Sequence, residues 1–443
     1  MATSKTFFFN VKRNEPQLVV AEKPTPDEIK QLSDIDDQEG LRFLIPIIFF
    51  YPPTVGGKLD PVKAIRDGLA KVLVDYYPFA GRIFEGPNRK LMINCNNEGI
   101  MFVEANADVK LEQLGDGILP PCPFMEELMC GVPESGGVIG CPLLFFQVTR
   151  FSCGGFSLGI RLNHTMADGY GIMLFLNAIG EVIKGASTLS IAPVWQRELL
   201  SARSPPRITC THNEYEQLEL DNQSTTNPQD DNILTSIFFG PKEIKALRNQ
   251  LPTNQAPSPT RFELMTACLW KCRTIAFEPN PNGITRISFL MNARQKKEMN
   301  LPIGYYGNGV VYPAAISKAG ILCESPLTYA FNLVRSAKAQ LSEEYVRSVA
   351  DLMVIKGRPK YATNLNYIVS DLTRLGFDKL DLGWGKPLFG GVSWATSIIS
   401  FYSNSKNYKE RDGIVVPISL PPLALKKFRD ELHKMICGPI SKI

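Results

Sequence analysis

One histidine and one aspartate, His164 and Asp168, lie four positions apart in the stretch GIRLNHTMADG, residues 159–169. An imidazole with a pKa near ~6.5 can take up a proton at neutral pH and give it back. It is therefore suited to general base catalysis on a hydroxyl group, which does not ionise at this pH. The alternative is a histidine hydrogen-bonded within the core, the more common situation for a lone histidine.

Alternation of apolar and polar residues predicts the element that positions this histidine. Every second residue from Phe156 to Leu162 is apolar, which indicates a β-strand. His164 continues the parity of the apolar residues, so we expect its side chain on the interior side of the sheet. Asp168 and Gly169 end the strand, and apolar residues at helical spacing predict a helix up to Ile183. The histidine thus lies where the chain leaves the core.

Length and composition narrow the classes of protein that fit. A chain of 443 residues with 44% apolar and 21% charged residues is typical of a globular protein of two domains. The net charge is only +4 and no Lys/Arg-rich block occurs, so we expect no nucleic-acid partner.

Cysteine and histidine usage argues against a metal site. The chain has ten cysteines without a CxxC pair and three histidines, His164, His212 and His433. Cys268 and Cys272 stand at helical spacing without histidine neighbours. We therefore expect no metal, and free thiols in a reducing compartment.

The sequence also bears on location. No apolar run reaches the length of a membrane span, and the N-terminal residues lack the apolar region of a secretory signal. We expect a cytoplasmic protein with no membrane partner. The last residues, Ser441-Lys442-Ile443, differ by one conservative change from the Ser-Lys-Leu peroxisomal address, which leaves a peroxisomal location as the alternative.

Both halves of the chain mix strand and helix patterns, so the predicted fold class is α/β. Residues 1–190 would form a first domain that carries the His164 strand, and residues 232–443 a second domain. Between them, residues 191–231 lose apolar periodicity and contain Pro193 and Ser204-Pro205-Pro206. This pattern predicts a long crossover linker.

Two motifs of the second half complete a family pattern. They are Asp381-Leu382-Gly383-Trp384-Gly385 and the turn Tyr305-Tyr306-Gly307-Asn308. Together with the H-x-x-x-D pattern of His164 and Asp168, they strongly resemble the plant BAHD acyltransferases over essentially the whole chain. Residues 32–40, 77–82 and 205–210 resemble the alcohol acyltransferase branch, which includes benzyl alcohol benzoyltransferases.

The resemblance implies two chloramphenicol-acetyltransferase-like domains with mixed sheets, joined by the crossover, and a solvent channel between them. Acyl-CoA would enter from one face and the acceptor from the other, in a monomer without a permanently bound cofactor. His164 would be the general base, and Asp168 would form a structural salt bridge with Arg294 of the segment Asn292-Ala293-Arg294. The alternative is that Asp168 orients the imidazole directly, as in a catalytic triad.

Further residues take supporting and binding roles by resemblance, except that Ser258 and Thr260 are suggested by their place at a predicted helix start, which favours anions, and Lys386 by its charge. Asn308, Asp381, Gly383, Trp384 and Gly385 would maintain the channel, with Leu382 where phenylalanine is typical. Acyl-CoA contacts are expected at Ser258, Thr260, Ser370, Asp371 and Lys386, and the acceptor pocket begins at Asp34 and Asp36. The alternatives are an ordinary helix cap for Ser258 and Thr260, a solvated charge for Lys386, and surface positions for the two aspartates.

The resulting hypothesis is an acyl-CoA-dependent O-acyltransferase of plant specialised metabolism. It would transfer a benzoyl-type or short acyl group to an alcohol. No cysteine or serine nucleophile adjoins His164, which favours direct transfer in a ternary complex over a covalent acyl-enzyme. The alternatives are N-acylation of an amine and a non-catalytic ligand-binding relative.

Overall fold

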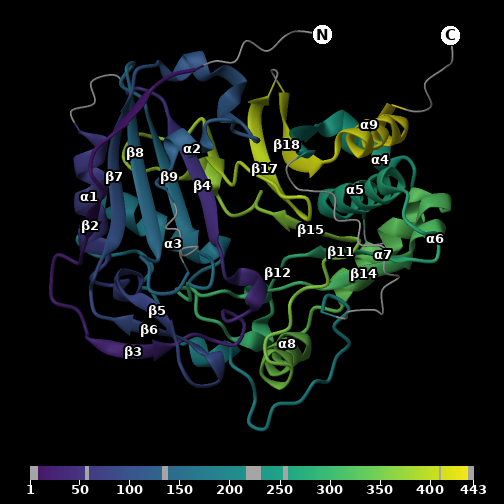
Figure 1. The fold of residues 1–443 in the computed structure, drawn as a ribbon, viewed down its shortest axis with the longest axis horizontal. Coiled ribbons are helices and arrows are strands. Elements are labelled where there is room, and N and C mark those ends of the chain that lie inside the picture. The colour runs from purple at the N-terminus through teal and green to yellow at the C-terminus, as the bar shows by residue number, and fades with distance from the viewer. Residues whose placement is uncertain are drawn as a thin grey trace.

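The structure is a computed structural model that describes residues 8–54, 59–131, 138–215, 231–252, 258–408 and 411–437. Two large β-sheets with their helices lie side by side (Figure 1), so the predicted α/β class is confirmed. No helix within these ranges combines the length and the apolar composition needed to cross a membrane. Ser441-Lys442-Ile443 lies outside the described residues, and the peroxisomal alternative stays a prediction.

The first sheet is built around β9 (Phe156–Asn163), the strand predicted to lead into His164. It pairs antiparallel with β8 (Leu144–Phe151) on one side and with β4 (Leu44–Tyr51) on the other. Apolar side chains of β9 share a core with helices α1 (Pro61–Val72) and α3 (Gly169–Ile183). The other strands of this sheet are β1 (Val11–Arg13), β2 (Gln17–Val19), β7 (Ile100–Ala107) and β16 (Phe389–Gly391).

The second sheet has six strands in the order β10-β18-β17-β15-β11-β14. Its core is shared with helix α5 (Arg261–Phe277), whose neighbours are α7 and α9. The strands are β10 (Ile233–Phe239), β11 (Ile284–Phe289), β14 (Ala314–Lys318), β15 (Asn366–Asp371), β17 (Ile399–Tyr408) and β18 (Arg411–Leu420). The other helices are α4 (Pro241–Arg248), α6 (Ala319–Glu324), α7 (Leu327–Ala339) and α9 (Pro422–Cys437).

Smaller elements flank the two sheets. A three-stranded sheet consists of β3 (Glu28–Gln31), β6 (Leu91–Cys95) and β5 (Arg82–Glu85). The short strands β12 (Met291–Asn292) and β13 (Val310–Val311) pair with each other. The remaining helices are α2 (Met125–Leu128) and α8 (Glu343–Ile355).

The two halves of the chain are interleaved. Strand β16 comes from the second half, yet it pairs antiparallel with β4 of the first sheet. Of the predicted crossover, residues 216–230 lie outside the described residues. Residues 191–215 contact both halves: Arg203 Nε contacts Asp351 Oδ2 of α8 at 2.6 Å, and the Ala202 N–H donates to Asp34 at 2.8 Å. The domain boundaries at residues 190 and 232 stay a prediction, and the strand exchange through β16 is a feature that the sequence pattern does not indicate.

Candidate active site

A cavity of about 590 Å³ lies between the two sheets. Its walls come from β4 and β9 of the first sheet and from β15 and β17 of the second. Exposed lining residues on two separate segments, Lys360 with Thr363 and Trp394, bring the cavity to the surface. Most of the lining is apolar, including Leu41, Phe43, Ile45, Ile47, Leu162, Leu290, Ile368, Leu372, Ile399 and Phe401.

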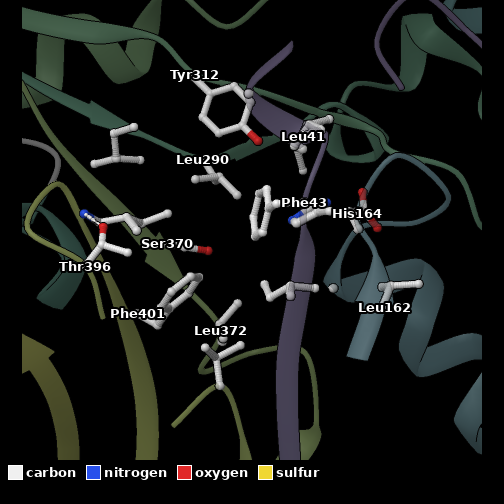
Figure 2. Close-up of a pocket in the computed structure, with 18 of the residues that line it drawn as sticks. Leu41, Phe43, Leu162, His164, Leu290, Tyr312, Ser370, Leu372, Thr396 and Phe401 are labelled. Atoms are coloured by element: carbon white, nitrogen blue, oxygen red, sulfur yellow. Dashed lines mark hydrogen bonds between the residues drawn. The ribbon is translucent and has the colours of Figure 1, made fainter. Parts of the chain in front are cut away.

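His164 lines this cavity, as the strand parity predicts. Its main-chain N–H donates to the Phe43 carbonyl at 3.0 Å, which extends the pairing of β9 with the β4 side by one residue. The imidazole is only 7% exposed and its ring centroid lies 5.3 Å from that of Phe43. Figure 2 shows the imidazole beside Phe43, directed toward the cavity. The prediction of an inward-facing side chain at the end of the strand is confirmed.

Burial determines the protonation state of this histidine. Removal from water lowers the pKa of His164, although Asp168 and Asp36 favour the charged form. The lowered pKa keeps the ring neutral at pH 7, so it can accept a proton.

Both carboxylate oxygens of Asp168 accept hydrogen bonds that hold neighbouring segments of the protein together. Asp168 is the N-cap of α3, where Oδ1 accepts the Gly171 N–H at 2.9 Å. Its other oxygen, Oδ2, accepts Arg294 Nη1 at 2.6 Å and the Gly309 N–H at 2.8 Å. Both carboxylate oxygens therefore have partners other than the imidazole. This geometry favours the structural salt bridge with Arg294 over the triad arrangement.

Arg294 fastens the turn that contains Asn308. Its guanidinium donates to the carbonyls of Tyr305 and Gly307 and lies over the Tyr170 ring, 4.6 Å from the centroid. A single side chain thus joins the start of α3 to the 305–309 turn.

A second buried ion pair reaches the main chain of His164. Asp36 Oδ1 accepts Arg197 Nη1 at 2.7 Å and the Asn308 side-chain amide at 2.9 Å. The same amide donates to the His164 carbonyl at 2.8 Å, and Arg197 Nη2 donates to the Met166 carbonyl at 2.8 Å. Burial by itself would lower the pKa of Arg197, but the charge of Asp36 raises it, so the guanidinium stays charged. The loop after β9 is therefore held from both sides.

Arg197 is the residue that sequence reasoning missed. It falls within the predicted crossover linker, where burial of a charge was not indicated, yet it is 1% exposed. Gly307 is the residue whose type could have indicated a bulky buried neighbour such as Arg197. A Cβ at Gly307 would be 2.1 Å from Arg197 Nη1, so the glycine of the Tyr-Tyr-Gly-Asn turn leaves room for the guanidinium.

The Asp34 and Asp36 carboxylates are not in the cavity, contrary to their expected place in the acceptor pocket. Asp36 is fully buried and serves the network just described. Asp34 accepts Lys90 Nζ and the Ala202 N–H, the latter at 2.8 Å. Donors of the protein itself hydrogen-bond both carboxylates, as burial of a charge requires. The resemblance concerns the positions of these aspartates in the sequence and does not indicate where their side chains point.

The turn at residues 381–385 lies away from the cavity. Asp381 Oδ1 accepts the N–H groups of Gly383 at 2.8 Å and Gly385 at 2.9 Å. Both glycines have positive φ, +102° and +79°, which side-chain-bearing residues rarely adopt. Trp384 packs edge-on against Phe156 of β9 at 5.1 Å, and Leu382 is buried in the same core. The turn therefore supports the back of the His164 strand.

The expected acyl-CoA residues separate into three groups. Ser370 and Asp371 line the cavity at the end of β15. Thr260 is the N-cap of α5 and accepts the Glu263 N–H at 3.2 Å, while Ser258 accepts Arg248 Nη1 at 3.0 Å. Lys386 is exposed and is not among the lining residues of the cavity.

A second cavity, about 630 Å³ in volume, lies between α4, the start of α5 and strands β17 and β18 of the second sheet. Three exposed cationic side chains, Lys245, Arg248 and Arg261, line it with Asp378 and Asp412. Asn404, also in its lining, donates to the Thr373 carbonyl at 2.7 Å, and Thr373 Oγ1 donates to Asp371 at 2.6 Å. Asp371 lines the first cavity, so this short chain of hydrogen bonds connects the basic cavity with the one that holds His164.

Relatives of this chain occur among known proteins. The model of the Transferase family matches residues 9–435. The chain is 53% identical to alcohol acyl transferase 1 allele GSd of Malus domestica, covering 97% of this chain and 95% of the relative. It is 51% identical to benzyl alcohol O-benzoyltransferase of Petunia hybrida, covering 98% and 95%.

Solved structures share the fold. Vinorine synthase aligns with a TM-score of 0.73 at 23% identity, covering 96% of this chain and 98% of that one. The structure of TRI101 of F. sporotrichioides complexed with coenzyme A and T-2 aligns with a TM-score of 0.67 at 16% identity, covering 91% and 97%.

Proposed function

Because the chain belongs to the Transferase family, the BAHD acyltransferases, we propose that it transfers an aromatic or short acyl group from CoA to an alcohol, with His164 as general base. The observation that carries the proposal is the neutral, buried imidazole facing an apolar cavity between the two sheets. The names of the relatives from apple and petunia support an alcohol as acceptor and a benzoyl-type group as one donor.

The mechanism follows from the state of His164. As the acceptor oxygen attacks the thioester carbon, the hydroxyl proton passes to the neutral imidazole, which removes the cost of forming a free alkoxide. When the tetrahedral intermediate collapses, the C–S bond breaks, and the imidazolium returns the proton to the CoA thiolate. General base catalysis of this kind contributes about 10²–10⁴-fold to the rate. Asp168, committed to Arg294, holds α3 and takes no proton.

The basic cavity is the place we propose for the nucleotide end of acyl-CoA. Lys245, Arg248 and Arg261 offer positive charge to phosphate groups, and the N-terminus of α5 at Thr260 adds its dipole. We place the pantetheine arm between the two cavities, beside the hydrogen-bonded chain from Asn404 to Asp371, so that it would bring the thioester to Ser370 and His164. Ser258 and Thr260 would then act through Arg248 and the helix start, and Lys386 has no role in this arrangement.

The test is ester formation by the purified protein from benzoyl-CoA, acetyl-CoA and hexanoyl-CoA with benzyl and aliphatic alcohols. We expect product with the wild type and at least a 100-fold loss of kcat in His164→Ala. His433→Ala is the matched control, since His433 is exposed on α9 and its removal should leave kcat unchanged. Near wild-type turnover by His164→Ala would overturn the assignment of the base, and a wild type that forms no ester would overturn the reaction.

We further propose a monomer located in the cytoplasm. Size-exclusion chromatography with light scattering tests the monomer. Fluorescent fusions that leave Ser441-Lys442-Ile443 free or cap it test the location, and peroxisomal signal with the free terminus alone would contradict it.

A further inference from the structure

Tyr312 introduces a hydroxyl into the largely apolar cavity that holds His164. It follows β13 and packs with Leu41, Val310 and Ile368 in a small apolar cluster, 5% exposed. Figure 2 shows its phenol projecting into the cavity, on the side where Leu41 and Phe43 border His164 and away from Phe401 and Leu372. Burial raises the pKa of Tyr312, so the group is a neutral phenol.

Tyr361 packs beside Tyr312. The two rings meet edge-on with centroids 4.8 Å apart. The Tyr361 hydroxyl donates to Gln38 Oε1 at 2.8 Å, and Tyr215 donates to the same oxygen. Gln38 in turn donates its amide to the Ile35 carbonyl at 2.7 Å.

The Tyr361 hydroxyl is thus engaged by Gln38, whereas the Tyr312 hydroxyl is directed into the cavity (Figure 2). A phenol can both donate and accept a hydrogen bond. A buried oxygen of this kind is best satisfied by a hydroxyl of a bound molecule.

From this arrangement we propose that Tyr312 forms a polar subsite for a second hydroxyl of the acceptor, so that the protein selects alcohols carrying a hydroxyl besides the one acylated. This inference rests on the proposed function, and it names the acceptor class. One hydroxyl lies at His164, and the other forms a hydrogen bond with Tyr312 Oη. The walls between the two groups are Leu41, Phe43 and Leu290, so the skeleton that joins the hydroxyls is apolar.

The experiment compares acceptors that differ only in the second hydroxyl, benzyl alcohol with the three hydroxybenzyl alcohols, and hexanol with 1,6-hexanediol. We expect the wild type to favour at least one hydroxylated member roughly tenfold in kcat/KM, the size expected for one hydrogen bond in a buried site. Tyr312→Phe, which removes only the oxygen, should abolish that preference and leave kcat/KM for benzyl alcohol within about twofold. Tyr329→Phe removes a tyrosine hydroxyl outside the cavity and should keep the preference.

Equal rates for the paired acceptors in the wild type, or an equal change for both members in Tyr312→Phe, would overturn the subsite. Binding of the same pairs to His164→Ala, measured by calorimetry, separates this inference from the proposed reaction. If the wild type forms no ester, the proposed function fails. A binding preference that Tyr312→Phe removes would still support the subsite, and the absence of that preference would overturn it.

Discussion

The side-chain amide of Asn308 donates both to Asp36 Oδ1 at 2.9 Å and to the main-chain carbonyl of His164 at 2.8 Å. Asp36 also accepts Arg197 and the Asn308 N–H, so the amide is oriented from a buried ion pair. Through this contact a charge outside the cavity helps to hold the main chain at His164. Asp36, Arg197 and Asn308 are therefore positioning residues for His164.

The first prediction concerns Asn308. Asn308→Ala removes the contact with the His164 carbonyl, and a displaced base lowers kcat by about 10–100-fold. The KM of acyl-CoA should stay within about twofold, because the basic cavity is untouched. Steady-state kinetics on folded protein measures both constants. Asn177→Ala, at an exposed asparagine on α3, is the control, and wild-type kcat in Asn308→Ala would contradict the positioning role.

The second prediction distinguishes a structural role of Asp168 from a role in a catalytic triad. Asp168→Asn leaves the largely buried Arg294 guanidinium without its counter-charge, so we expect the free energy of unfolding to fall by about 3–5 kcal/mol. Chemical denaturation measures this loss. At a temperature where the variant remains folded, kcat should stay within about tenfold of the wild type, whereas a triad partner would lower kcat by about 10⁴-fold without a comparable loss of stability.

The third prediction is the pH dependence of kcat/KM. Since burial lowers the pKa of His164, the neutral, active form persists below pH 6.5, and activity declines only at more acidic pH. The acid limb in the free enzyme should therefore have an apparent pKa below 6.5, with a tenfold fall per unit further down. A limb at or above 6.5 would indicate a different base or a solvated histidine.

The local sequence pattern was sufficient to predict the strand and the helix around His164, because period-two alternation and helical spacing are properties of residues that are close together in the sequence. It was insufficient for Arg197, whose burial depends on Asp36, 161 positions away in the chain. The surroundings of Asp36 likewise depend on residues that are far away in the sequence. The resemblance placed Asp36 near the acceptor pocket, but its carboxylate faces Arg197 and Asn308. The pairing of β16 with β4 is likewise visible only after folding, since a three-residue strand carries almost no periodicity.

The last prediction locates the nucleotide of acyl-CoA. Arg261→Gln removes one positive charge from the basic cavity, so the KM of acyl-CoA should rise about threefold to tenfold, with kcat and the acceptor KM unchanged. An acyl-pantetheine donor lacks the nucleotide, and its kcat/KM should be the same in the variant and the wild type. Lys386→Gln is the matched control, because Lys386 is an exposed cation outside the lining of this cavity. An equal loss with both donors would mean that Arg261 acts through folding, and a rise in KM for Lys386→Gln alone would move the nucleotide to the 381–385 turn.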